Sequence, residues 1–65
     1  MIKDAEEYNH SLKFLAVCYR QYGEEVAFGV EEGIPGDEIL LLTGGIHSMI
    51  IQLESEIRAY EEKND

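Results

Sequence analysis

The chain has 65 residues and one cysteine, and its fourteen Asp and Glu residues against five Lys and Arg give a formal net charge of −9. A single domain of this length buries only about 60% of its unfolded surface, so we expect a marginally stable monomer. One cysteine excludes an internal disulfide and no Cys/His spacing fits zinc, which leaves self-association as the expected source of stability. The acidic balance argues against direct binding to nucleic acid and is compatible with a basic protein partner.

The N-terminal segment predicts a cytoplasmic protein. Asp4, Glu6 and Glu7 stand where a secretion signal would have basic residues followed by an apolar stretch. No apolar run approaches the roughly 20 residues that span a bilayer, so we expect no membrane association.

The first predicted element is an amphipathic helix from about residue 5 to about residue 28. Asp4 and Glu7 have the spacing of a capping box at its start. Apolar residues then recur at alternating steps of three and four, at Ala5, Tyr8, Leu12, Leu15, Tyr19, Tyr22 and Val26. Gly29 is the predicted stop of this helix, and the Gly- and Pro-containing segment 29–37 is the predicted loop.

A second helix is predicted from about residue 38 to about residue 62, with Asp37 as its cap. The same alternation of steps passes through Ile39, Leu42, Ile46, Met49, Leu53 and Tyr60. It does not slip at Gly44 and Gly45, so we predict one continuous helix rather than two short ones. Each glycine costs about 1 kcal/mol relative to alanine in a helix interior, and we therefore expect a compensating close contact at the pair.

Each predicted helix is also apolar on a second side. The stretch 14–19 is apolar all round, and a mostly small stripe follows Leu41, Gly44, Ser48, Ile51 and Ser55. In an antiparallel hairpin, residues 14–19 stand level with residues 46–51, and a single hairpin covers only one of the two sides. We therefore predict an all-α fold: one domain over residues 1–65, an antiparallel helical hairpin that assembles into a homodimer or higher homo-oligomeric bundle. The predicted oligomer interface consists of Phe14, Cys18, Leu41, Gly44, Ser48 and Ile51.

The sequence contains no recognisable catalytic or metal-binding set. Glu7 and His10 have the Glu-x-x-His spacing of a carboxylate-bridged di-metal site. Such a site needs a second pair of this kind, and the residue three positions before His47 is Gly44 rather than a glutamate. Cys18 lacks an activating basic neighbour on its own helix face and is interpreted as a small core residue. We expect no enzymatic activity, no cofactor and no bound metal.

An acidic cluster surrounds the predicted loop. It consists of Glu24, Glu25, Glu31 and Glu32, and it lacks the spacing of a calcium loop. These glutamates have two possible roles: they serve only to keep this end of the molecule hydrated, or they form an acidic face for a basic partner.

One small-molecule site is predicted across a subunit boundary. Thr43, Gly44 and Gly45 would expose backbone there and His47 would supply a titratable donor. The residues expected to approach them are Tyr19, Arg20 and Tyr22. Bare backbone beside an arginine and aromatic rings suits a small nucleotide, although each of these residues also has a packing explanation.

Two family resemblances extend these expectations. The segments "IKDAEEY", "GIPGDEILLL" and "QLESEIRAYEEKND" resemble the helical region that precedes the DNA-binding domain in HigA-like antitoxins and related helix-turn-helix regulators. No helix-turn-helix follows here, so this resemblance implies toxin binding or oligomerisation without operator recognition. The segment "IPGDEILLLT", followed by Met49, is similar to a segment of small helical phage proteins that sequester cyclic nucleotides of the CBASS defence system. That similarity implies ligand contacts at Thr43 and Tyr19.

We therefore expect a non-enzymatic, acidic, oligomeric binding protein that acts by occupying a partner, as an antitoxin-like or inhibitor-like interaction module does. The alternative is a phage-type anti-defence sponge that sequesters a cyclic nucleotide signal between subunits. The resemblances imply a bacterial or phage-infected host cytosol.

Overall fold

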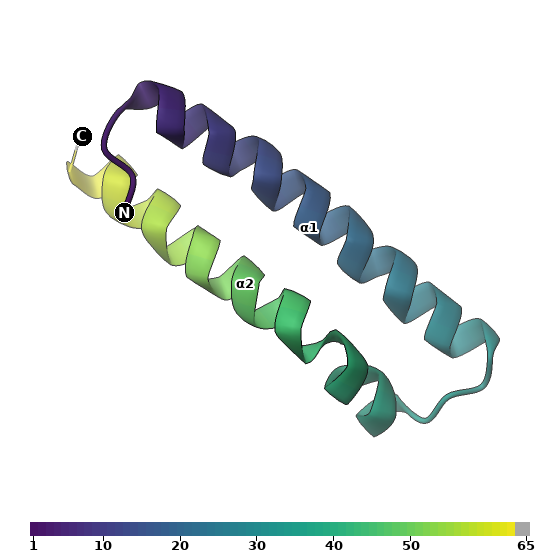
Figure 1. The fold of residues 1–65 in the computed structure, drawn as a ribbon. Coiled ribbons are helices and arrows are strands. Elements are labelled where there is room, and N and C mark those ends of the chain that lie inside the picture. Colours follow the sequence, from purple (N-terminus) through teal and green to yellow (C-terminus); the bar gives the residue numbers. More distant parts are fainter. Residues whose placement is uncertain (64–65) are drawn as a thin grey trace.

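The computed structural model describes residues 1–63 and consists of two helices that pack antiparallel as a hairpin (Figure 1). Helix α1 spans Ala5–Glu31 and helix α2 spans Gly36–Lys63. The start of α1 therefore lies beside the end of α2, in a rod with extents of 45 × 17 × 15 Å. The predicted all-α hairpin is confirmed, and both helices are longer than predicted at the turn between them.

The predicted cap of α1 is also confirmed. An Asp4 carboxylate oxygen accepts a hydrogen bond from the backbone N–H of Glu7 at 2.9 Å. The Glu7 side chain reaches back and accepts one from the backbone N–H of Lys3 at 3.0 Å. The first bond satisfies a backbone donor that the first helical turn cannot pair internally, and the second pairs a donor just before the cap.

The predicted stop of α1 at Gly29 is wrong, because the helix continues to Glu31 and Gly33 ends it. Gly33 has a φ of +72°, a conformation that favours glycine. The N–H of Ile34 donates to the carbonyl of Gly29 at 2.9 Å, and the N–H of Gly33 donates to that of Val30 at 3.1 Å. This pair of bonds is a Schellman motif, which reverses the chain immediately after the helix.

The start of α2 also differs from the prediction. Asp37 lies inside the first helical turn together with Glu38, whereas the backbone carbonyl of Pro35 accepts from the N–H groups of Glu38 and Ile39, both at 3.0 Å. The two acidic side chains are still well placed, since negative charge in the first turn interacts favourably with the helix dipole.

The two helices meet along a narrow seam. The buried or half-buried residues of α1 that follow it are Tyr8, Ser11, Leu15, Cys18, Tyr22, Val26 and Gly29. Those of α2 are Ile39, Thr43, Ile46, Ile50, Leu53, Ile57 and Tyr60. Both sets recur at steps of three or four, as expected for a helix pair.

The predicted core is therefore only partly right. Leu12, Tyr19, Leu42 and Met49 were expected inside and are exposed, with Leu42 at 70%. Small and polar residues that the apolar pattern passed over lie inside in their place. One of these, Thr43, is 2% exposed and donates its hydroxyl to the carbonyl of Ile39 at 2.8 Å, so this buried polar group is paired.

The Gly44–Gly45 pair lies inside α2, which confirms the continuous helix. A Cβ atom added to either glycine would meet nothing within 4 Å. The compensating contact expected from the sequence is therefore not supplied by the hairpin itself.

A close contact does occur at Gly29. A Cβ atom there would lie 2.7 Å from Cγ1 and 2.9 Å from Cδ1 of Ile39. Both Gly29 and Ile39 are buried. The absent side chain thus allows α2 to approach the backbone of α1 next to the turn.

We predict that Gly29→Ala destabilises the hairpin relative to Gly23→Ala. Both changes gain the same helix propensity, about 1 kcal/mol. Only the first forces Ile39 to move, at a typical overpacking cost of about 1–3 kcal/mol, whereas a Cβ at Gly23 meets nothing within 4 Å. Urea unfolding followed by circular dichroism should give this difference, and equal stability of the two variants would contradict it.

Candidate functional site

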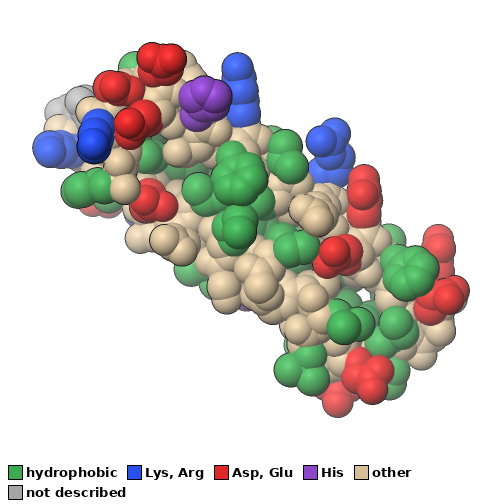
Figure 2. Space-filling view, viewed as in Figure 1, with side chains coloured by type: hydrophobic (Ala, Val, Ile, Leu, Met, Phe, Trp, Pro, Cys, Tyr) green, Lys and Arg blue, Asp and Glu red, His purple; other side chains and the backbone are tan. Residues whose placement is uncertain are grey.

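More large apolar side chains of the hairpin are exposed than buried among residues 1–63. Among residues 1–63 only four apolar side chains form the buried core: Cys18, Ile39, Ile50 and Ile57. Twelve large apolar side chains of the same region are exposed: Met1, Leu12, Phe14, Val17, Tyr19, Phe28, Val30, Leu40, Leu41, Leu42, Met49 and Ile51. Figure 2 shows hydrophobic side chains gathered along one face of the rod, over both helices, with acidic side chains near its two ends.

Most of the predicted interface residues lie open on the surface. Phe14, Leu41 and Ile51 are 48–81% exposed. Ser48 is exposed as well, and Gly44 is half-buried with open space in front of it. Because Leu41, Gly44, Ser48 and Ile51 follow steps of three and four, they share one side of α2.

Cys18 differs from the other interface candidates. It is 3% exposed, and its Sγ lies 3.8 Å from Sδ of Met49, inside the seam. A single hairpin therefore leaves Cys18 no surface for a second subunit, because α2 already covers it. The same contact confirms that the stretch 14–19 stands level with 46–51.

The predicted small-molecule residues do not form one cluster. The rings of Tyr22 and His47 lie together, with centroids 5.9 Å apart and planes tilted by 31°. Thr43 is buried, and its hydroxyl is bonded to its own helix. Arg20 is exposed two positions from the inward-facing Cys18 and Tyr22, so helical geometry turns it away from α2.

Two tyrosines tie the helices together at the surface. The hydroxyl of Tyr8 donates to the Glu61 carboxylate at 2.6 Å, and the ring of Tyr8 stacks on that of Tyr60 at 5.0 Å. The hydroxyl of Tyr19, a predicted ligand contact, donates to the carboxylate of Glu54. These hydrogen bonds, with smaller contributions from desolvation and carboxylate charge, raise the pKa of both tyrosines above the ordinary value of 10.0.

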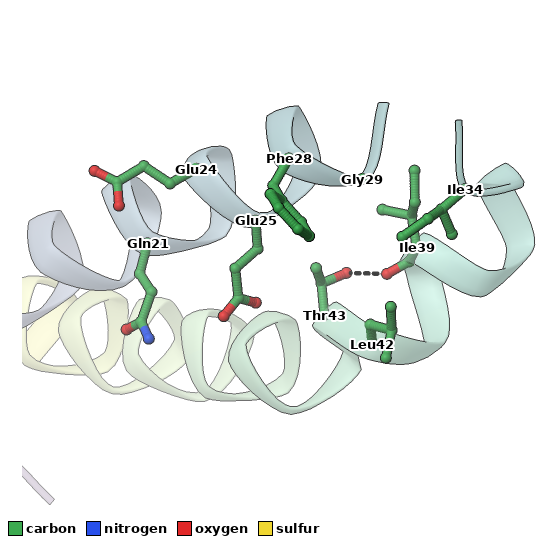
Figure 3. Close-up of a pocket in the computed structure, with 9 residues that line it drawn as sticks. All are labelled: Gln21, Glu24, Glu25, Phe28, Gly29, Ile34, Ile39, Leu42 and Thr43. Atoms are coloured by element: carbon green, nitrogen blue, oxygen red, sulfur yellow. Dashed lines mark hydrogen bonds between the residues drawn. The ribbon is translucent and has the colours of Figure 1, made fainter. Parts of the chain in front are cut away.

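All four glutamates of the predicted acidic face are exposed, and two of them line a groove at the turn end of the hairpin. The groove has a volume of about 500 Å³. Its apolar walls include Phe28 from α1, Ile34 from the turn and Leu42 from α2. Figure 3 shows Gln21 and Glu25 pointing across it toward α2, whereas Glu24 points away.

Sequence reasoning missed this groove. Phe28 lies at the predicted end of the first helix and Leu42 was assigned to the core. The available signal was the apolar cluster of Phe28, Ile34 and Leu42 on both sides of the turn, beside a row of glutamates.

A second groove of about 500 Å³ lies at the open end of the rod. Its lining includes Met1, Lys3, Glu56 and Lys63. The N-terminal amine of Met1 forms an ion pair with Glu56 at 3.1 Å. The two grooves thus have the same size and opposite charge character, one bordered by carboxylates and the other by two lysines.

No group of three or more His, Cys, Asp or Glu side chains among residues 1–63 is placed to hold a metal ion. Neither helix, as far as the described residues extend, is long and apolar enough to cross a membrane.

Comparisons of the chain with protein-family models, with curated proteins and with solved structures found no match.

We predict that stability falls as the pH rises above about 10 and that replacing both Tyr8 and Tyr19 by phenylalanine removes part of this fall. A tyrosine whose pKa is higher in the folded state stabilises the fold below its unfolded pKa, and this contribution is lost as the pH rises through the folded pKa. Urea unfolding of both proteins between pH 8 and pH 11 measures the effect, at values that span the ordinary tyrosine pKa near 10. Parallel curves would contradict the role given to the two hydroxyls.

Proposed function

We propose that the chain is a non-enzymatic protein-interaction module that self-associates and acts by occupying a protein partner. The observation that carries the proposal is the set of twelve exposed large apolar side chains on a hairpin with only four buried apolar ones among residues 1–63. Apolar side chains that gather on the surface of a small protein are typical of interaction sites, and Figure 2 shows such side chains over both helices.

The accessible surface supports the same proposal. The hairpin exposes 5007 Å², whereas a compact monomer of 7.4 kDa is expected to expose about 4200 Å². The elongated shape of the rod accounts for the difference, and it leaves room for a standard protein interface of roughly 800 Å² per partner. A second helical layer on the rod would cover a surface of this size.

Self-association through the outer side of α2 would cover part of this surface. Leu41 and Ile51 lie there at 81% and 54% exposure, with Gly44 and Ser48 between them. Small residues at this spacing allow two helices to approach closely, which would provide the contact that Gly44 lacks within the hairpin. Two hairpins joined in this way form a four-helix bundle.

The acidic balance favours a basic protein as the partner to be occupied. The net charge is −9, and Glu24, Glu25, Glu31 and Glu32 are all exposed around the turn. This arrangement suits an antitoxin-like or inhibitor-like role, in which an acidic surface covers the basic functional surface of another protein.

The second candidate is a sponge that holds a cyclic nucleotide between subunits. The paired rings of Tyr22 and His47 favour it, because aromatic rings provide a surface on which a base can stack. The Thr43 hydroxyl weighs against it, because it is buried and already bonded to its own helix. Calorimetry with cyclic dinucleotides and cyclic ADP-ribose isomers separates the two candidates, since heat of binding is expected only for the sponge.

We predict that Gly44→Leu dissociates the oligomer and leaves each hairpin folded. Nothing in the hairpin lies within 4 Å of a Cβ at Gly44, so a larger side chain harms only a contact made by another subunit. Overpacking such a contact typically costs about 1–3 kcal/mol. Sedimentation velocity gives the mass of the assembly, and circular dichroism reports whether each hairpin stays folded.

Gly23→Leu is the matched control, because Gly23 is equally open but lies on α1 outside the predicted interface. We expect this variant to sediment as the unchanged protein does. A Gly44→Leu protein of unchanged mass would remove the close contact from the proposal, and a monomeric unchanged protein would overturn self-association itself.

A further inference from the structure

We propose that the groove at the turn end binds a basic amphipathic helix of the partner protein, with an aliphatic or aromatic side chain inserted between Phe28 and Leu42 and a Lys or Arg facing Glu25. This inference rests on the proposed function and specifies the partner's chemistry and the place where it binds. It concerns a surface separate from the outer side of α2.

The groove is formed by the way the chain turns. The contact of Ile39 with the bare backbone at Gly29 holds the helices together next to the turn. Phe28 and Leu42 are nevertheless 61% and 70% exposed, so the side chains that wall the groove are not covered by each other. The result is an open apolar groove of about 500 Å³ along the rod (Figure 3).

The floor of the groove favours an apolar group. Ile39 and Thr43 are buried there, and the Thr43 hydroxyl already donates to the carbonyl of Ile39 at 2.8 Å. A polar group of the partner inserted between Phe28 and Leu42 would lose its hydrogen bonds to water. It could not accept a hydrogen bond from the Thr43 hydroxyl in exchange. Transfer of an aliphatic or aromatic side chain from water into the groove lowers the free energy, and so does the removal of both groove walls from water.

The border of the groove specifies the charge of the occupant. Glu25 points across the groove toward α2, with the Gln21 amide beside it and Glu24 on the neighbouring surface (Figure 3). None of the lining residues in the described chain is basic. A Lys or Arg one helical turn from the inserted apolar side chain would therefore meet a carboxylate that has no cationic neighbour in the groove.

Like-charge repulsion disfavours the other occupants. A second copy placed turn to turn would bring its own Glu24, Glu25 and Asp37 against the same carboxylates. A nucleotide would bring phosphates against them. Both arrangements place negative charges together as they leave water, whereas a basic helix neutralises them.

The groove at the open end provides an internal comparison. It has the same volume of about 500 Å³, but Lys3 and Lys63 line it. A ligand that recognised only the apolar surface and size of a groove would bind both grooves. A basic helix should distinguish them, because only the turn end offers an unpaired run of carboxylates at its border.

The test uses the full chain and two synthetic peptides. The first is a 14-residue amphipathic helix of Leu, Ala and Lys with leucines on one face, a length of about 21 Å. The second has Glu in place of every Lys. Calorimetry measures affinity, and backbone amide chemical shifts locate the binding site.

We expect the Lys peptide to bind and to shift the amides of Glu25, Phe28 and Leu42 but not those of Ser55 and Ala59, which line the other groove. Its affinity should fall as salt rises from about 0.05 M to about 0.5 M, because screening weakens exposed charge pairs. The Glu peptide should bind much more weakly. Equal affinity of the two peptides, or Lys-peptide shifts confined to the open end, would overturn the inference.

Three variants test the residue assignments. Glu25→Gln should weaken the Lys peptide about two- to fivefold, as expected for one exposed ion pair. Leu42→Ser should weaken it about tenfold or more, because it removes one apolar wall. Both side chains are exposed, so the hairpin should stay folded, which circular dichroism verifies.

The control is Glu6→Gln, which makes the same change of charge in the first turn of α1, at the far end of the rod. It should leave peptide affinity unchanged. An equal loss in Glu6→Gln and Glu25→Gln would mean that overall charge attracts the peptide and would overturn binding in the groove.

Peptide binding and sedimentation distinguish a wrong groove assignment from a wrong proposal of self-association. A chain that self-associates normally but does not bind the Lys peptide contradicts only the groove assignment. A chain that binds the peptide at the groove but sediments as a monomer contradicts only self-association.

Discussion

The structure depends on one constraint: a pair of helices can bury only one narrow strip of each. Here small residues interrupt that strip at Ser11, Cys18 and Gly29 on α1 and at Thr43 on α2, among larger aliphatic and tyrosine side chains. Small side chains bring the backbones close, most clearly where Ile39 contacts the backbone at Gly29. The same choice leaves larger groups such as Phe28, Leu41 and Leu42 on the outside. The tight seam and the apolar surface are thus two consequences of one packing arrangement.

The distribution of charge suits different parts of this apolar surface to the two kinds of partner that we propose. The middle of α2's outer side presents Gly44 and Ser48, which carry no charge, and a second copy of the chain can approach there without repulsion. The turn end carries Glu24, Glu25, Glu31 and Glu32, which repel another copy and attract a basic protein. An oligomer formed through α2 would therefore present several acidic ends and keep them available. Multivalent binding of this kind raises avidity without any new contact.

The Gly44–Gly45 pair shows what the spacing of apolar residues predicts about a helix and what it does not. The unbroken steps of three and four correctly predicted that the helix continues through both glycines. No contact within the hairpin compensates for their low helix propensity, since a Cβ added to either glycine would meet nothing within 4 Å. Gly29 shows the opposite case. It was interpreted as a helix stop, whereas its function is to allow contact with Ile39, a residue ten positions later in the chain.

The sequence by itself determined the two helices, the Asp4 cap, the continuity of α2 and the antiparallel hairpin, because these depend on local spacing and on a short connection. Only the tertiary structure decided which of two adjacent stripes faces inward. In α2 the inward line keeps Ile39, Ile46 and Leu53 of the predicted stripe but passes through Thr43 and Ile50 rather than Leu42 and Met49, a partial rotation of that stripe. The helical period fixes the spacing of a stripe, but the rotation of each helix about its axis is set by how side chains fit across the seam. That rotation also exposes Leu42 beside Phe28 and so creates the groove, which could not be predicted from either helix alone.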